Sequence, residues 1–385
     1  MLAPERSAEI LEAEQMILDT VRTLAEEKIL PRAAQIDQTG EYPTDVKDLF
    51  AKNDLLGIPF PEEYGGLNSF LTYVKVVEEI SKVCATSSLI IAVQELGALP
   101  LMIAGSDAQK KEYLPKFATG EWMTSYALTE ASSGSDASNM RTTAVRDGDH
   151  YVLNGTKVFI TNVAAADVCI VFAMTDKDLR AKGGISAFVC RTSDPGFKLG
   201  KVENKMGIRG SPTNEVLLEN CRIPADRLLG AEGDGFKIAM ATLDKSRPGI
   251  AAQALGIAQG AFDFAAKYLK ERVAFGKPLA RQQGLQWMIA DMDCEIQAAR
   301  LLLYEAARKC DEGAPDVTYW GALCKLKCGD VAMRVTTDAV QLLGGYGYMT
   351  EYPVERMMRD AKITQIYEGT QQIQRIVIAR KTLGK

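Results

Sequence analysis

Apolar residues recur at the spacing of helix faces along the first part of the chain. The first series is Ile10, Met16, Ile17, Val21 and Leu24, and this spacing predicts an amphipathic helix. A second helix is predicted to begin at Thr44, which suits an N-cap, and another at Ser106, where the next residues complete a capping box. We therefore predict an N-terminal helical domain over residues 1–120.

The pattern changes at about Trp122 to short runs of strand-forming residues separated by turns. Asn154-Gly155, between two of these runs, predicts a hairpin turn rather than a glycosylation site. The middle β domain is predicted over residues 121–232. Its strands are expected at 151–153, 158–161, 168–173, 185–190 and 215–218.

Helical periodicity returns after Gly235, with longer repeats. One stripe contains Ile257, Ala261, Phe264 and Tyr268, and a second contains Met292, Ile296, Ala299 and Leu303. Such stripes over a long helical segment are typical of a four-helix bundle, which we predict over residues 233–385. The fold class expected for the whole chain is α+β.

The composition excludes several functional classes. The chain has 385 residues, 47% hydrophobic and 25% charged, with a net charge of −5, which is typical of soluble globular proteins. Lys and Arg are interspersed with Asp and Glu, so nucleic-acid binding is not expected. The most apolar stretch is interrupted by Glu95 and Pro100, and membrane insertion is not expected either.

Histidine and cysteine limit the chemistry further. The chain has a single histidine, His150, in a polar stretch, which argues against a Ser-His-Asp triad, a His-rich zinc site and haem ligation. We expect His150 on a solvated turn. The eight cysteines contain no Cys-x-x-Cys pair, although Cys324 and Cys328 share the spacing of one helix face. They are interpreted as buried reduced thiols, with no metal site.

The expected location is cytoplasmic, or the mitochondrial matrix if a transit peptide has been removed. This expectation depends on the reduced cysteines and on the N-terminal segment, which is rich in glutamate where a signal or transit peptide would be basic.

The usual nucleotide-binding signatures are missing from the sequence. It contains no P-loop and no Gly-x-Gly-x-x-Gly at the start of a βα unit. Instead, residues 126–130 and 134–136 gather hydroxyls, glycines and backbone donors that suit a polar ring edge or a phosphate. Taken alone, this segment is more typical of a plain Ser/Gly loop. Its sequence is Tyr126-Ala127-Leu128-Thr129-Glu130 followed by Gly134-Ser135-Asp136.

Four further segments follow in order: Lys157-Val158-Phe159-Ile160-Thr161-Asn162, Glu271-Arg272-Val273-Ala274-Phe275-Gly276-Lys277, Gln341-Leu342-Leu343-Gly344-Gly345-Tyr346-Gly347, and the stretch from Tyr352-Pro353 to Glu368-Gly369-Thr370. Together the five motifs resemble the acyl-CoA dehydrogenase flavoproteins over essentially the whole chain, with the short- or medium-chain and bacterial butyryl-CoA types nearest. The resemblance implies helical, barrel-like β and four-helix domains assembled as a homotetramer. It also implies FAD between the β domain and the bundle, with its adenosine end against a neighbouring subunit.

The resemblance implies two sets of FAD-binding residues. The first would line the flavin: Tyr126, Leu128, Thr129, Gly134, Ser135, Phe159, Ile160 and Thr161. Phe159 stands where many members have Trp, which keeps a stacking face but loses an indole donor. The second set would come from the neighbouring subunit: Arg272, Phe275, Gln283, Gln341 and Gly345, with Thr370 and Gln372 nearby.

The same resemblance implies that Glu368 is the catalytic base. A carboxylate desolvated between a flavin and a thioester has its pKa raised, which makes it a useful base. Its backbone N–H would polarise the thioester carbonyl together with a ribityl hydroxyl of FAD. The product would be a trans-2-enoyl-CoA, with electrons passed to an electron-transferring flavoprotein. Residues implied to contact the substrate are Ser135, Asp244, Arg247, Tyr367 and Gly369.

Two positions refine the subfamily. Isovaleryl-type and long-chain members take their base from the residue before the arginine at 247, which is Ser246 here. Glutaryl-type members use an arginine in the helical region before the flavin loop, yet the chain has none between Arg32 and Arg141. Decarboxylation of a dicarboxylate is therefore not expected.

Glu95 is the charge within the apolar stretch, and it has two interpretations. It either points outward near a helix end closed by Gly97, or faces the far end of the acyl group and limits its length or accepts a polar, cyclic or unsaturated chain. Two alternative functions also stay open, a non-catalytic assembly protein with this fold and a dehydrogenase specialised for cyclic or branched acyl-CoA. The sequence does not fix acyl chain length, branching, physiological direction or redox partner.

Overall fold

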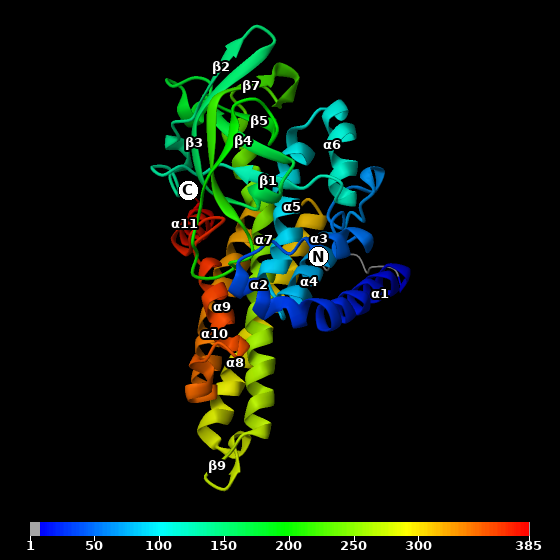
Figure 1. Cartoon of the computed structure of the whole chain (residues 1–385), viewed down its shortest axis with the longest axis vertical. Coiled ribbons are helices and arrows are strands. Elements are labelled where there is room, and N and C mark those ends of the chain that lie inside the picture. Colours follow the sequence, from blue (N-terminus) through cyan, green and yellow to red (C-terminus); the bar gives the residue numbers. More distant parts are fainter. Residues whose placement is uncertain (1–7, 385) are drawn as a thin grey trace.

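The computed structural model describes residues 8–384 and places helices on both sides of the β-rich segment (Figure 1). The N-terminal segment is helical, as predicted. It contains α1 (Ala8–Leu24), α2 (Ala33–Thr39), α3 (Thr44–Lys52), α4 (Phe70–Ser81), α5 (Ala85–Ala104) and α6 (Asp107–Thr119).

The structure confirms the predicted start of α6 fully and that of α3 in part. The capping box of α6 is present: the Ser106 hydroxyl accepts from the Gln109 N–H at 3.2 Å, and the Gln109 side chain accepts from the Ser106 N–H at 2.9 Å. α3 begins at Thr44, but Pro43 occupies its N-cap and no side chain caps the helix.

The predicted apolar stripe of α1 is partly wrong. Ile10 and Met16 are exposed, whereas Val21 is buried. A charged residue shares the inner face instead, because Glu14 forms an ion pair with Lys75 on α4. A buried, paired carboxylate is tolerated where an isolated one would not be, and no apolar periodicity could have shown this.

α5 is the central helix of the N-terminal segment. By length and composition it could cross a membrane, but 78% of its apolar window is buried inside the protein. It packs against α4, α7 and β1. α5 is therefore a core helix, and it does not end at Gly97 but continues to Ala104.

The middle segment forms an eight-stranded sheet in the order β6-β7-β3-β2-β4-β5-β8, with β1 parallel to β4. β6 and β8 form its two ends and do not pair with each other, so the sheet stays open and the barrel-like expectation is corrected. The strands are β1 (Thr124–Ala127), β2 (Thr143–Asp147), β3 (His150–Thr161), β4 (Val168–Met174), β5 (Ile185–Arg191), β6 (Phe197–Val202), β7 (Thr213–Pro224) and β8 (Leu228–Leu229).

The hairpin turn predicted at residues 154–155 is wrong, because β3 runs through this point as one strand with a register shift. The turn lies earlier, at Gly148, which has a φ of +62° and joins β2 to β3. Gly155 serves close packing instead, since a Cβ there would lie 2.5 Å from the Thr142 hydroxyl oxygen. His150 begins β3 beside the turn, half-buried and next to Asp149.

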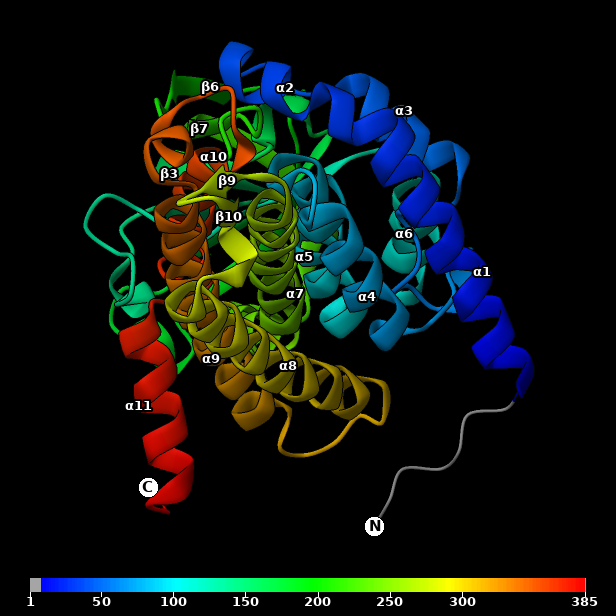
Figure 2. The same ribbon diagram turned by 90° about the horizontal axis from the view of Figure 1, so that it is seen from below.

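The C-terminal segment forms the helical bundle. α7, α8 and α9 are long helices, and the shorter α10 packs against α7 and α9. α11 also packs against α9, and its C-terminal end projects from the bundle (Figure 2). A two-stranded hairpin of β9 (Val273–Ala274) and β10 (Lys277–Pro278) lies at the far tip of the bundle (Figure 1). The helices are α7 (Gly235–Glu271), α8 (Gln283–Asp311), α9 (Val317–Leu343), α10 (Pro353–Ile363) and α11 (Gln371–Thr382).

The predicted bundle stripes are largely confirmed. The four residues of the α8 stripe are all buried, whereas the α7 stripe is buried at Ile257 and Ala261 and half-buried at its C-terminal end. All eight cysteines are free thiols, and Cys324 and Cys328 are buried together on α9. Cys294 is exposed and Cys310 only half-buried, so the expectation that every thiol is buried is wrong for α8.

Gly97 permits the close approach of α5 to β1. A Cβ at this position would lie 2.1 Å from the Thr124 hydroxyl oxygen and 2.6 Å from its Cβ. We expect Gly97→Ala to lower the free energy of unfolding by about 1–3 kcal/mol through overpacking, measured by urea denaturation. Gly284→Ala on α8, where nothing lies within 4 Å of the added Cβ, is the control. Equal denaturation midpoints for the two variants would contradict this packing.

Candidate active site

Glu368 lies in the loop between α10 and α11 and reaches toward α7. Its backbone is left-handed, with a φ of +50°, and Gly369 follows with a φ of +90°. A non-glycine residue in this region is uncommon and marks a constrained site. The Ser246 hydroxyl, buried on α7, donates to the Glu368 carboxylate at 2.5 Å. The strained loop thus directs a carboxylate onto the bundle.

Two buried side chains hold the carbonyls of this loop. Lys325 on α9 donates from Nζ to the Gly369 carbonyl at 2.7 Å, and Gln374 donates to the same oxygen at 3.0 Å and to the Glu368 carbonyl at 3.3 Å. Within residues 8–384, the Glu368 N–H takes part in none of the backbone hydrogen bonds of the loop. This N–H is available to a bound carbonyl group.

Burial raises the pKa of Glu368 above its usual value. The Ser246 hydrogen bond and the positive charges of Lys325 and Arg247 act in the opposite direction. Burial also lowers the pKa of Lys325 to about 8. Glu368 is therefore a carboxylate whose proton affinity is shifted toward the range useful for a general base.

The predicted substrate-contacting residues on α7 bind each other. Arg247 is buried and forms an ion pair with Asp244 at 2.7 Å, and Asp244 also accepts from the Thr318 hydroxyl at 2.6 Å. The Arg247 Nε atom is buried without a hydrogen-bond partner. Tyr367 donates its hydroxyl to Gln253 on α7. Of these side chains, Arg247 keeps a free donor.

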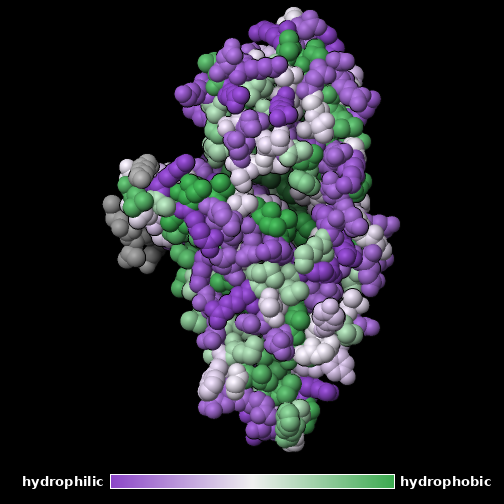
Figure 3. Space-filling view, turned by 90° about the vertical axis from the view of Figure 1, so that its left-hand side faces the viewer, coloured by the Kyte–Doolittle hydropathy of each residue, from purple (hydrophilic) through white to green (hydrophobic). Residues whose placement is uncertain are grey.

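The segment after β1 lies beside the end of β3, as the predicted flavin site requires. The Val158 N–H donates to the Thr129 carbonyl at 2.9 Å, and the Ser125 hydroxyl donates to the Thr161 carbonyl at 2.7 Å. The face seen in Figure 3 is hollowed at mid-height, and hydrophobic residues show inside the hollow. The hydrogen bond between Val158 and Thr129 brings two of the five sequence motifs together at this end of the sheet.

A buried ion pair locks the two motifs. Lys157, with 0% of its side chain exposed, binds Glu130 at 2.8 Å and the Leu128 carbonyl at 3.0 Å. Glu130 also accepts from the backbone N–H groups of Arg141 and Thr142, at 2.6 and 3.0 Å. Burial lowers the pKa of Lys157 to about 8. For Glu130, burial acts to raise the pKa, but Lys157 and Thr142 outweigh it and the net shift is downward.

Features of this loop region fit a flavin. Phe159 is 62% exposed with a left-handed φ of +60°, so its ring is free to stack. A Cβ at Gly134 would meet nothing within 4 Å, and the Tyr126 hydroxyl is buried without a hydrogen-bond partner. The Phe159 ring suits the face of a flavin, and the open backbone at Gly134 and the Tyr126 hydroxyl suit its polar edges.

Not every predicted flavin residue can contribute its side chain. Leu128 and Ile160 are buried in the hydrophobic core, so only their backbone groups are available. Ser135 is exposed beside Gly134. Thr370 caps α11 by accepting from the Ile373 N–H, and Gln372 is exposed on the same helix.

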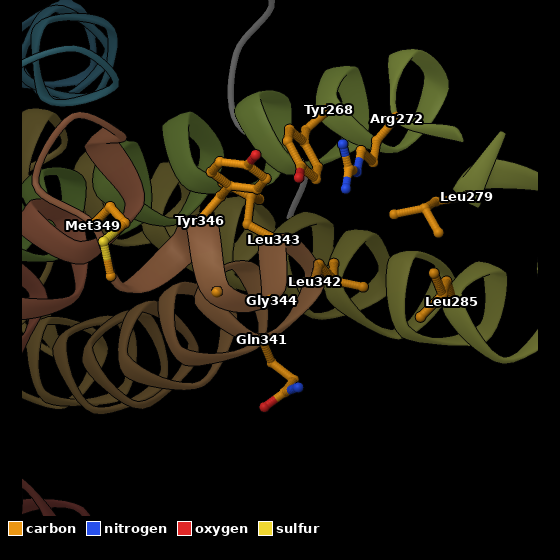
Figure 4. Close-up of a pocket in the computed structure, with 11 residues that line it drawn as sticks. Tyr268, Arg272, Leu279, Leu285, Gln341, Leu342, Leu343, Gly344, Tyr346 and Met349 are labelled. Carbon is orange, nitrogen blue, oxygen red and sulfur yellow. The ribbon is translucent and has the colours of Figure 1, made fainter. Parts of the chain in front are cut away.

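The second predicted set is divided: Thr370 and Gln372 lie at the start of α11, close to Glu368 in the chain, whereas its other members lie at the other end of the bundle. Arg272, Gln341 and Gly345 line a cleft of about 610 Å³ (Figure 4). The Arg272 guanidinium stacks 5.5 Å from the centre of the Tyr346 ring. Phe275, 94% exposed in the hairpin at the bundle tip, and Gln283, exposed at the start of α8, lie outside the cleft lining. The cleft lined by Arg272, Gln341 and Gly345 is thus separate from the site that holds Glu368.

The chain belongs to the acyl-CoA dehydrogenase family. It matches the N-terminal domain of these enzymes over residues 11–121, the middle domain over 125–221 and the C-terminal domain over 233–383. The chain is therefore an oxidoreductase of this family.

Curated relatives include enzymes with different names. The chain is 50% identical over 365 residues to the probable acyl-CoA dehydrogenase FadE25 of Mycobacterium tuberculosis, covering 94% of this chain and 93% of the relative. It is 49% identical over 370 residues to a short-chain specific acyl-CoA dehydrogenase of Clostridium acetobutylicum, with 96% and 97% covered. It is 48% identical over 377 residues to a cyclohex-1-ene-1-carbonyl-CoA dehydrogenase of Geobacter metallireducens, with 97% and 99% covered.

Solved structures agree over almost the whole chain. Butyryl-CoA dehydrogenase from Megasphaera elsdenii has a TM-score of 0.94 at 45% identity, covering 96% of this chain and 98% of that one. A chain from a structure on the electron transferring flavoprotein of Acidaminococcus fermentans has a TM-score of 0.96 at 47% identity, with 100% of both chains covered. Glutaryl-CoA dehydrogenase from Mycobacterium smegmatis in complex with FADH2 has a TM-score of 0.90 at 31% identity, with 97% and 95% covered. The cofactor of the family is FAD.

The Lys157–Glu130 pair gives a stability prediction. Lys157→Met leaves the Glu130 carboxylate buried without its counter-charge, and we expect the free energy of unfolding of the apoprotein to fall by about 3–5 kcal/mol. The exposed pair Lys198–Glu219 supplies the control, since Lys198→Met should change stability by less than about 0.5 kcal/mol. Urea denaturation measures both. Equal losses in the two variants would show that the buried pair does not hold the loop.

Proposed function

We propose that the protein is an FAD-dependent dehydrogenase that converts a short or medium acyl-CoA into its trans-2-enoyl-CoA, with Glu368 as the base. The observation that carries this proposal is the Glu368 carboxylate, which is held on α7 by Ser246 and has its pKa raised by burial. Burial raises the pKa of Tyr126 on β1 and the charge of Glu368 raises it further, so the carboxylate lies near a predicted flavin residue, which supports the same assignment.

Each group of the site has a defined task in this reaction. Glu368 accepts the proton from the α-carbon of the thioester, and the electrons of that C–H bond form the new double bond. FAD, when bound, accepts the hydride that leaves the β-carbon. The Glu368 N–H donates to the thioester carbonyl oxygen, where negative charge develops as the α-proton leaves. Lys325 keeps this N–H aimed at the substrate because it fixes the next carbonyl.

Several observations support a short or medium straight chain. Ser246, where other subfamilies carry the base, donates a hydrogen bond to Glu368 and cannot replace it. The helical region before the flavin loop lacks the arginine that a second carboxylate would need. The relatives include a short-chain specific enzyme and a butyryl-CoA dehydrogenase. Arg247 would bind the CoA moiety, and Ser135, exposed on the loop after β1, would contact the substrate as well.

The proposal extends to partners and location. An electron-transferring flavoprotein would take the electrons, which is consistent with the structure of such a system among the neighbours. A homotetramer would place the Arg272 set of one subunit against the FAD of another. The eight free thiols support a reducing compartment, the cytoplasm or the mitochondrial matrix.

The two alternative functions differ in how much support they have. A non-catalytic assembly protein would need neither the buried Glu368 carboxylate nor its contacts from Ser246 and Lys325, so this alternative is not favoured. A specialised dehydrogenase for cyclic acyl-CoA has one observation behind it, since a cyclohex-1-ene-1-carbonyl-CoA dehydrogenase is a relative at 48% identity.

Glu368→Gln tests the base. The amide is nearly the same shape, so we expect FAD content to be retained while the rate of flavin reduction falls on the order of 10²-fold or more. Anaerobic bleaching of the flavin by butyryl-CoA and octanoyl-CoA in a stopped-flow instrument measures this. Glu351→Gln, at an exposed position, is the control and should bleach like the wild type. Bleaching of Glu368→Gln at the wild-type rate would place the base elsewhere.

Arg272→Ala tests the shared cofactor site. One guanidinium would serve both the FAD pyrophosphate and the subunit contact, so we expect flavin content and oligomeric mass to fall together. Absorbance and light scattering measure the two quantities. Arg222→Ala, which removes an exposed ion pair with Asp147 on the sheet, should change neither. Retention of both properties in Arg272→Ala would make Arg272 an ordinary surface charge.

A further inference from the structure

Helix α5 carries a carboxyl group into the interior of the protein. Glu95 is 1% exposed, and both of its carboxyl oxygens are buried without a hydrogen-bond partner. The hydroxyl of Tyr73 on α4 is buried beside Glu95 without a hydrogen bond of normal length, although it lies close enough to lower the pKa of Glu95. These positions rule out the interpretation of Glu95 as a residue of the helix surface. Buried polar groups are nearly always hydrogen-bonded, so two groups without a normal hydrogen bond need an explanation.

The two side chains border the catalytic site. The Tyr73 hydroxyl packs against Gly249 on α7, where an added Cβ would lie 2.4 Å from it. Gly249 follows Ser246, the partner of Glu368, by about one turn of α7, or roughly 5 Å along the helix. The charge of Glu368 raises the pKa of both Tyr73 and Glu95. Glu95 and Tyr73 therefore lie near the base, on the side toward α4 and α5.

Burial favours the protonated, uncharged form of the Glu95 carboxyl group. Burial raises its pKa well above the usual value and the charge of Glu368 raises it further, whereas Tyr73 and Lys245 act in the opposite direction. A protonated carboxyl group both donates and accepts hydrogen bonds, as does a tyrosine hydroxyl. A second carboxylate on a ligand would add negative charge beside Glu368. The matching ligand group is therefore uncharged.

Beside a plain alkyl chain these groups would have only each other as partners, and the hydrogen-bonding capacity that stays unused costs binding free energy. An oxygen on the acyl chain would satisfy them. Sites built to hydrogen-bond a substrate hydroxyl discriminate strongly against the analogue that lacks it. We propose that Glu95 and Tyr73 are specificity-determining residues that bind an uncharged hydroxyl or keto oxygen on the acyl chain, beyond the carbons that react. This inference rests on the proposed function, because it assigns the substrate class of the same site.

The test compares matched substrates in the FAD-loaded enzyme. Butyryl-, pentanoyl- and hexanoyl-CoA are each paired with the acyl-CoA that carries a terminal hydroxyl. We expect wild-type kcat/KM to favour the hydroxylated partner by about tenfold or more in at least one pair, the size of one added hydrogen bond. A preference for the plain substrate in every pair would overturn the proposal.

Variants assign the preference to the two residues. Glu95→Leu should remove it and move the optimum toward longer straight acyl-CoAs, whereas Glu95→Gln should keep it because an amide also donates and accepts. Tyr73→Phe should weaken it. An unchanged preference in Glu95→Leu would contradict the assignment. FAD content and the thermal midpoint of each variant exclude misfolding as the cause.

The two proposals fail in different ways in this experiment. Reduction of the flavin by plain acyl-CoA, without preference for a hydroxylated partner, would overturn the specificity inference and leave the dehydrogenase activity standing. Flavin that no acyl-CoA reduces would overturn the proposed function itself.

Discussion

The need to hold one carboxylate away from water, next to a reacting carbon, constrains the architecture of this protein. Glu368 achieves this because its loop is tied from two directions, by Ser246 on α7 and by Lys325 on α9. The long helices α7 and α9 hold these two residues buried in the bundle. Without the contacts to Ser246 and Lys325, nothing would offset the strain of the left-handed backbone in this loop.

This arrangement costs stability at neutral pH. The folded-state pKa values of Glu368 and Glu95 are raised above their unfolded values, so the native state binds these protons more tightly than the unfolded chain does. Stability therefore falls as the pH rises from the ordinary carboxyl range through the raised pKa values. The large apolar cores around the helices offset this cost.

The sequence predicted most of the fold because helical and strand periodicities are local properties. Helix α6 with its capping box and the buried stripe of α8 follow from neighbouring residues alone. Two failures show the limit of local patterns. Asn154-Gly155 has the sequence of a hairpin turn, but Gly155 is required by close packing against Thr142. Met16 fits the apolar stripe but is exposed, because the buried Glu14 pairs with Lys75 on the inner face of α1.

The site was predictable only in part for the same reason. Glu368 was found through its motif, but its partners Ser246 and Lys325 lie far away in the chain. The Glu130–Lys157 pair joins two motifs that the sequence showed only in order, without their contact. Glu95 was visible as a charge in an apolar stretch, yet only its packing beside Tyr73 separated the two interpretations.

The central claim is that Glu368 is the base and that Ser246 sets its proton affinity. The direct test is the pH dependence of kcat/KM for butyryl-CoA in the wild type and in Ser246→Ala, because this profile reports the ionisation of the free enzyme. The Ser246 hydrogen bond lowers the pKa of Glu368, so the account predicts that the acid limb of the profile moves to higher pH in the variant. An acid limb at the same pH in both proteins would contradict it.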